Sequence, residues 1–285
     1  MNLSQLTEIL EEIGGQASII DLIVCAAGVF VLVWWLLKTS LGTKALDDAP
    51  CRRNNMPPLY AVIPLFMWIL TASILLFIKE RALTDLPDWQ GALVDNLIMC
   101  LGVAPAIATG LMIARRCFAR RLKGLGLDSR TIPRDLGAGL LNLLAVMPAV
   151  LAAIILTILA GKLIAGPGFE IPRHKELQEI MAYPQWQVRA LIVFTTIVVV
   201  PFTEELVFRG MFQTLLRSYI VRPWPAIIIA SFIFIIFHED TLHWPALFVL
   251  ALCLGYAYEK SGSLFRPIFI HSLFNALSVL GTLSR

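Results

Sequence analysis

Three charged side chains interrupt an apolar segment, and their spacing suits acid–base chemistry. Residues 190–202 are apolar apart from two threonines, and Glu204, Glu205 and Arg209 follow at once. Glu205 and Arg209 are four residues apart on one helix face, which predicts an ion pair. Glu204 points about 100° away and lacks such a partner, so we expect it to act as a general base supported by the pair. The alternative interpretation is a purely structural ion network.

Two further polar points follow on apolar segments. His238 ends the apolar run 226–237, with Phe234 one turn earlier on the same face. His271 and Asn275 are four residues apart and therefore share a face of another apolar segment. Taken singly, His238 reads as an interfacial cap and the second pair as interhelical hydrogen bonding. Taken together with Glu204, they predict one buried hydrolytic site.

Two versions of that chemistry fit the residues, and the sequence leaves both open. In the first, Glu204 activates a water molecule, His238 orients it, and His271 with Asn275 stabilises the tetrahedral intermediate. In the second, Glu204, His238 and His271 bind Zn²⁺, in the manner of two-histidine, one-glutamate sites that keep a position open for water. The chain contains no HExxH motif, so the common helix-borne zinc signature is absent.

The elements that must position these residues are membrane helices. The chain of 285 residues is 58% hydrophobic and only 15% charged, which predicts an all-α, polytopic membrane protein rather than a soluble domain. About eight apolar segments approach the ~20 residues that a bilayer core requires. They are 17–37, 58–78, 92–114, 137–161, 188–208, 223–238, 242–258 and 264–282. The net charge of +3 gives no indication of a nucleic-acid partner.

The basic residues predict the orientation of these segments and a division of the chain. Alternate loops hold 16 of the 23 lysines and arginines, which places those loops in the cytoplasm. The most basic stretch, 115–134, either serves as a topology signal or lies on anionic lipid headgroups. We expect an amino-terminal transmembrane region with basic cytoplasmic loops over 1–136 and a catalytic core over 137–285.

Spacing also brings two of the candidate residues to one level. Glu204 and His238 each lie 17 residues from Val221, which begins a predicted turn at Val221-Arg222-Pro223. If the flanking segments form an antiparallel helical hairpin, the carboxylate and the imidazole stand at the same height, ~25 Å from the turn at 1.5 Å per residue.

The motifs resemble a known family. In chain order they are Glu204-Glu205-x-x-x-Arg209, Phe234-x-x-x-His238 and His271-x-x-x-Asn275. This pattern, within 188–282, is similar to the CAAX protease and bacteriocin-processing (CPBP) intramembrane proteases, also called the type II CAAX prenyl endopeptidase or ABI family. The resemblance implies eight membrane helices and a catalytic cavity open to the cytoplasmic leaflet. It also implies Glu204 as the base, with His238, His271 and Asn275 as its partners.

The resemblance further implies an intramembrane endopeptidase. Its substrate is a peptide or protein, prenylated in eukaryotic members, and bacterial members often act in bacteriocin immunity or peptide maturation. We expect a bacterial inner membrane, with the endoplasmic reticulum as the alternative. Two other functions stay open: a non-enzymatic scaffold or immunity protein, and a proton-coupled transporter, although a transporter usually repeats its charged sites in both halves.

Overall fold

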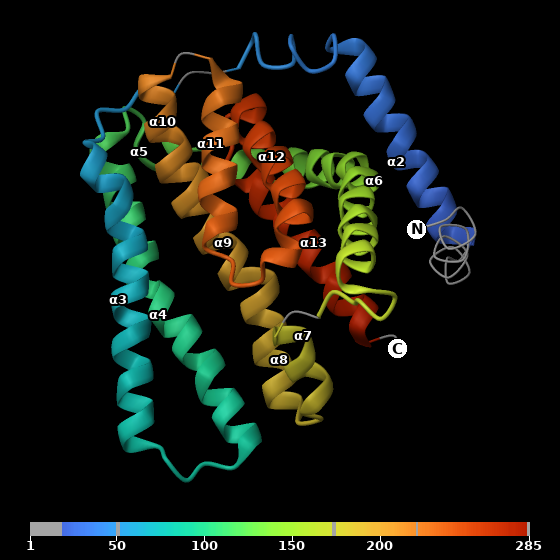
Figure 1. The fold of residues 1–285 in the computed structure, drawn as a ribbon. Helices are drawn as coiled ribbons and strands as arrows, with labels where there is room; N and C mark the ends of the chain where they lie inside the picture. The colour runs from blue at the N-terminus through green and yellow to red at the C-terminus, as the bar shows by residue number, and fades with distance from the viewer. Residues whose placement is uncertain (1–18, 50–51, 173–174, 221, 284–285) are drawn as a thin grey trace.

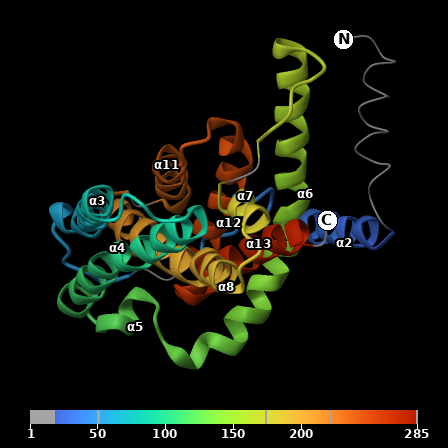
Figure 2. The same cartoon turned by 90° about the horizontal axis from the view of Figure 1, so that it is seen from below.

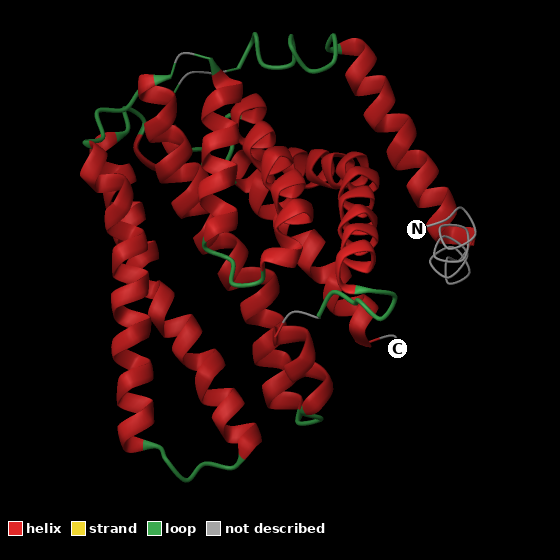
Figure 3. Ribbon diagram, viewed as in Figure 1, coloured by secondary structure: helices red, strands yellow, loops and turns green. Residues whose placement is uncertain are grey.

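The predicted all-α class is confirmed. The computed structural model describes residues 19–49, 52–172, 175–220 and 222–283. The structure is 82% helical, and no strand occurs in those ranges, as Figure 3 shows. The predicted centre of the hairpin turn, Val221, lies outside the described residues.

The long helices coincide with the predicted apolar segments. In chain order the helices are α2 (Ile19–Lys38), α3 (Pro58–Ala82), α4 (Asp88–Cys117), α5 (Arg121–Leu125), α6 (Ile132–Ala165), α7 (Lys175–Ala182), α8 (Trp186–Phe194), α9 (Val200–Glu204), α10 (Thr214–Tyr219), α11 (Pro223–Ile236), α12 (Trp244–Ser261) and α13 (Phe265–Leu283). Two π-helical segments, η2 (Thr195–Val199) and η3 (Glu205–Gln213), join α8, α9 and α10 into one continuous helix.

Five helical segments are long and apolar enough to cross a membrane. They are Pro58–Ala82, Asp88–Cys117, Ser129–Ala165, Trp186–Tyr219 and Thr241–Ser261. Two shorter apolar helices, Ile23–Lys38 and Pro223–Ile236, add to them. Several spans, and hence a multi-pass membrane protein, are therefore supported, while the count of about eight stays a prediction.

Proline and glycine mark the ends of these helices. Proline occupies the first or second position of α3, α6, α11 and α12, where its missing N–H would have no partner within the helix anyway. At the other end, α12 stops at Gly262, which has a φ of 68° in the left-handed region that glycine tolerates. The boundaries thus follow from local chemistry.

The continuous helix 186–219 runs through the centre of the molecule beside α11, α12 and α13 (Figure 1). The α3–α4 hairpin lies on one side of this centre, and α2 lies at the opposite edge (Figure 2). α2 packs on α6, which in turn packs on α12 and α13. The α2–α6 contact is close, because a Cβ on Gly28 would stand 2.4 Å from the Leu144 carbonyl oxygen. Glycine is therefore required there.

One buried cluster draws on both sides of residue 136. It contains Met56, Ile113 and Leu125 together with Leu206 and Tyr258. The amino-terminal helices therefore pack directly on the central helix that carries the glutamates. The division into 1–136 and 137–285 stays a prediction about function.

Candidate active site

The predicted ion pair is present and sealed inside the protein. The side chains of Glu205 and Arg209 are 0% and 1% exposed. The Arg209 Nη1 donates to Glu205 Oε1 at 2.9 Å, and its Nη2 donates to the Ala251 carbonyl oxygen on α12 at 3.2 Å. The guanidinium also lies 4.7 Å from the centre of the Phe234 ring. These contacts supply the partners that make a buried arginine tolerable.

The structure brings His271 to both glutamates. Its Nδ1 lies 3.0 Å from Glu205 Oε1, and its Nε2 lies 3.7 Å from Glu204 Oε2. Because an ionised carboxylate only accepts, Nδ1 carries the proton of the first contact. Glu205 therefore fixes the orientation of the imidazole and aims Nε2 at Glu204.

Glu204 is the more available of the two carboxylates. Its side chain is 12% exposed, whereas that of Glu205 is 0% exposed. Glu204 Oε2 is buried without a hydrogen-bond partner. Glu205 Oε2 is also unpartnered, but Glu205 is closed off and its other oxygen holds both Arg209 and His271.

His238 contacts the Phe234 ring, which also faces His271. It follows the end of α11 and is half-buried. Its Nδ1 lies 3.0 Å from the Phe234 carbonyl oxygen, and its ring centre lies 4.6 Å from that of Phe234. The same phenyl ring stands 6.1 Å, edge on, from His271. The Phe234 ring therefore lies between the imidazoles of His238 and His271. No ion pair joins His238 to Glu204 in the part of the chain that the structure describes.

Asn275 makes a contact that the sequence did not suggest. Its Nδ2 donates to the Thr196 carbonyl oxygen at 2.8 Å. In the π-helical η2, the Val200 N–H donates to Thr195, and the next residue, Pro201, has no N–H. Both helical donors that the Thr196 carbonyl would normally find are therefore missing, and Asn275 replaces them.

A row of polar side chains extends from the site toward the loops that we predict to be cytoplasmic. Gln213, four residues after Arg209, donates to the Gly255 carbonyl oxygen and to Glu259 Oε1, each at 3.0 Å. Arg217 Nε donates to Glu259 Oε2 at 3.2 Å. Glu259 is 1% exposed. Glu205 is thus tied to α12 through Arg209, and the same face of the helix makes further polar contacts with α12 at Gly255 and Glu259.

Sequence reasoning missed three of these relations: the Glu205–His271 contact, the Thr196 carbonyl and the buried Glu259. Two of them could have been recognised from the sequence. A proline inside an apolar helix indicates an orphaned carbonyl, and a glutamate near the end of an apolar helix indicates a buried partner. The contact between His271 and the second glutamate could not have been recognised, because it depends on how two helices rotate.

The proposed zinc ligands do not stand together as a set. Among the described residues, no group of three histidine, cysteine, aspartate or glutamate side chains is placed to hold a metal ion. His271 Nδ1 is engaged by Glu205 and His238 Nδ1 by a carbonyl. We therefore derive no step through zinc, and the ligand set Glu204, His238 and His271 stays a prediction.

The comparisons with known proteins agree with the motif resemblance. Residues 185–277 match the family model of the type II CAAX prenyl endopeptidase Rce1-like proteins, so the predicted family resemblance is confirmed over that segment. A 124-residue segment is 26% identical to an Escherichia coli protein described as an uncharacterized 24.3 kDa protein, covering 42% of this chain and 57% of that protein. No solved structure matches. The matched family is a protease family, and the several apolar helices fit an integral, multi-pass membrane protein.

Proposed function

We propose that this protein, which resembles the type II CAAX prenyl endopeptidases over residues 185–277, is an intramembrane endopeptidase with Glu204 as its general base. One observation carries the proposal. Glu204 Oε2 is buried without a hydrogen-bond partner and stands 3.7 Å from the Nε2 of a histidine whose other nitrogen is fixed by Glu205. A carboxylate left free beside an oriented imidazole can accept a proton from water.

We place one water molecule in contact with both groups. The separation of 3.7 Å exceeds a direct hydrogen bond and is too short for a water on the line between the two atoms, so this water lies to one side of that line. In the proposed step, Glu204 takes a proton from this water while the oxygen attacks the peptide carbonyl carbon. The carbon–nitrogen bond then breaks, and Glu204 returns the proton to the leaving amine.

The negative charge that develops on the peptide oxygen needs a donor. We assign this role to His271 in its protonated form, with Glu205 balancing the positive charge through Nδ1 at 3.0 Å. In a site shielded from water such a donor is worth several kcal/mol. Arg209 donates to the same Glu205 oxygen at 2.9 Å and holds that carboxylate in place.

His238 is suited to orient the water from the opposite side. Because a carbonyl oxygen only accepts, its contact with Phe234 places the proton on Nδ1. The other ring nitrogen, Nε2, then carries a lone pair. We propose that it accepts a hydrogen bond from the attacking water or from the substrate amide.

We assign Asn275 a positioning role. One of its amide hydrogens is used at Thr196, which ties α13 to η2 one turn beyond His271. This tie holds the imidazole at the glutamate pair. The predicted contact of Asn275 with the oxyanion uses the second amide hydrogen, and the two roles are separated by experiment below.

The substrate is proposed to be a peptide or protein cleaved near the cytoplasmic side of the membrane. Family members that act on prenylated cysteine make lipidated peptides the first substrates to test, in farnesylated and unmodified pairs. We propose the bacterial inner membrane as the location, with the endoplasmic reticulum as the alternative.

Glu204→Gln tests the proposal. The purified variant should keep the melting temperature of the wild type and lose cleavage by at least ~100-fold, as expected for loss of a general base. Glu176→Gln, at an exposed position on α7, is the matched control and should cleave normally. Comparative peptidomics of membranes that contain either variant should reveal peptides that accumulate only with Glu204→Gln.

Retained cleavage in Glu204→Gln would refute the assignment. A scaffold or immunity function predicts that the variant keeps its biological effect without any change in membrane peptides. Proton-coupled uptake by the wild type, lost in the variant, would favour the transporter. Metal analysis of the same preparations tests the zinc version.

A further inference from the structure

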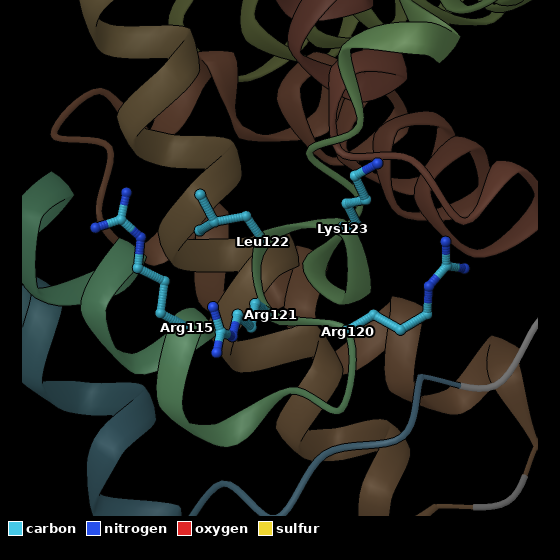
Figure 4. A pocket seen from close by; sticks show the side chains of 5 residues that line it. All are labelled: Arg115, Arg120, Arg121, Leu122 and Lys123. Atoms are coloured by element: carbon cyan, nitrogen blue, oxygen red, sulfur yellow. The ribbon is translucent and has the colours of Figure 1, made fainter.

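A basic cavity lies at the end of α4, away from the glutamates. It has a volume of about 410 Å³ and is lined by Arg115, Arg120, Arg121, Leu122 and Lys123. Figure 4 shows Arg115 on one side and Arg120 with Lys123 on the other. The volume falls within the range typical of small-molecule sites.

The charge of this cavity is largely uncompensated. Residues 96–127 include no aspartate or glutamate. Lys123 pairs with Asp128 at 3.5 Å, whereas Arg115, Arg120 and Arg121 form no ion pair within the described ranges. These cations border one open pocket, with the ends of Arg115 and Arg120 pointing to opposite sides of it in Figure 4, and their summed charge attracts an anion to it. A topology signal requires basic residues in the loop but does not require them to line one cavity.

The backbone that carries these cations is held rigidly. Phe118 and Leu125 are buried, and the Tyr258 hydroxyl of α12 donates to the Leu125 carbonyl oxygen at 3.0 Å. Arg121 adopts a φ of 52°, an uncommon left-handed conformation for a residue with a side chain. Its N–H donates to the Phe118 carbonyl oxygen at 2.9 Å. The arginines therefore project from a fixed platform rather than from a loose loop.

The position of the cavity indicates what kind of anion reaches it. One candidate span ends at Cys117 and the next begins at Ser129, and from this position between two spans we expect the cavity to face the lipid headgroups. Arginine binds phosphate oxygens with paired, directional hydrogen bonds. We infer that this cavity binds the phosphate of an anionic phospholipid headgroup. The inference is independent of whether the protein is a protease.

Binding to short-chain phosphatidylglycerol tests the inference on the purified full chain in a neutral detergent. The wild type should bind this lipid and be protected from heating by it, but not by the matching phosphatidylcholine or by inorganic phosphate. The double variant Arg120→Gln/Arg121→Gln should bind about 30-fold more weakly, roughly fivefold for each lost surface cation.

Two variants complete the experiment. Lys44→Gln/Arg222→Gln removes the same charge from exposed positions outside the cavity and should change the affinity less than about twofold. Asp128→Asn keeps an acceptor for the hydrogen bond from the Arg130 N–H, frees Lys123, and should strengthen binding up to about fivefold.

Three outcomes would overturn the inference. Equal weakening in both double variants would mean that diffuse surface charge, and not this cavity, attracts the lipid. Unchanged binding in Arg120→Gln/Arg121→Gln would remove the cavity from consideration. Equal binding of inorganic phosphate and of the lipid would assign the cavity to free phosphate.

Discussion

Replacing Asn275 by alanine should loosen the contact between α13 and the central helix. The amide of Asn275 donates to the Thr196 carbonyl oxygen at 2.8 Å. The Val200 N–H donates to the Thr195 carbonyl oxygen and not to that of Thr196, and Pro201 has no N–H. Asn275→Ala therefore leaves an acceptor without a partner inside a membrane helix.

The expected cost is ~1–3 kcal/mol, the usual penalty for an acceptor stripped of its donor away from water. Pro201→Ala restores a backbone N–H next to the orphaned carbonyl. In the double variant Pro201→Ala/Asn275→Ala this N–H can take over from the missing amide. We expect the double variant to recover ~1 kcal/mol or more beyond the sum of the single effects.

Unfolding in detergent micelles and peptide cleavage should be measured for all four members of this cycle. Asn142→Ala is the matched control, since no hydrogen bond of the Asn142 side chain is found among the described residues of the chain. It should change stability by less than ~0.5 kcal/mol.

The two roles of Asn275 then separate. If Asn275 positions His271, cleavage returns together with stability in the double variant. If Asn275 contacts the oxyanion, the double variant is stable and still inactive. An Asn275→Ala protein as stable as the wild type would refute the reasoning about the Thr196 carbonyl.

Three further predictions concern stability. Glu205→Ala should lower the free energy of unfolding by ~3–5 kcal/mol, because it strands the buried guanidinium of Arg209; a well-folded but inactive variant would contradict this. Gly255→Ala places a Cβ 2.8 Å from a buried glutamine oxygen and should cost ~1–3 kcal/mol, while Gly137→Ala, with no atom within 4 Å, should stabilise slightly. The pKa of Asp128 is lowered mainly by a hydrogen bond from a backbone N–H. The ionised Asp128 therefore contributes to folding stability above about pH 4, and this contribution is lost as the pH falls through the lowered pKa. The melting temperatures of wild type and Asp128→Asn should then converge in acid.

The helices and the Glu205–Arg209 ion pair were predictable because each depends on short-range chemistry. Apolar segments of membrane length must form helices, since lipid offers no partners for the backbone. The Glu205–Arg209 pair followed from a spacing of four residues and is present in the structure. The helices on either side of residue 221 pack together and bring Phe234 against Arg209, a contact that the sequence did not predict; that Glu204 and His238 stand at the same height stays a prediction.

The hydrogen-bond partners of the histidines and of Asn275 were not predictable in the same way. A spacing of four residues shows that His271 and Asn275 share a face, but not which neighbour that face meets. The structure turns Asn275 to a backbone carbonyl and His271 to both glutamates. Contacts between helices depend on the rotation of each helix, and rotation is determined by packing over the whole surface.

The π-helical geometry of η3 explains why one glutamate is sealed and its neighbour is not. Hydrogen bonds that run from residue i to i+5 give more residues per turn than the 3.6 of an α-helix, so a spacing of four comes closer to a full turn. Glu205, Arg209 and Gln213 therefore align in a row, and the last two reach the α12 carbonyls of Ala251 and Gly255. An α-helix would rotate each successive residue of that row by about 40° away from α12. The row holds Glu205 against α12, and the adjacent Glu204 is left beside His271 with an unpartnered oxygen.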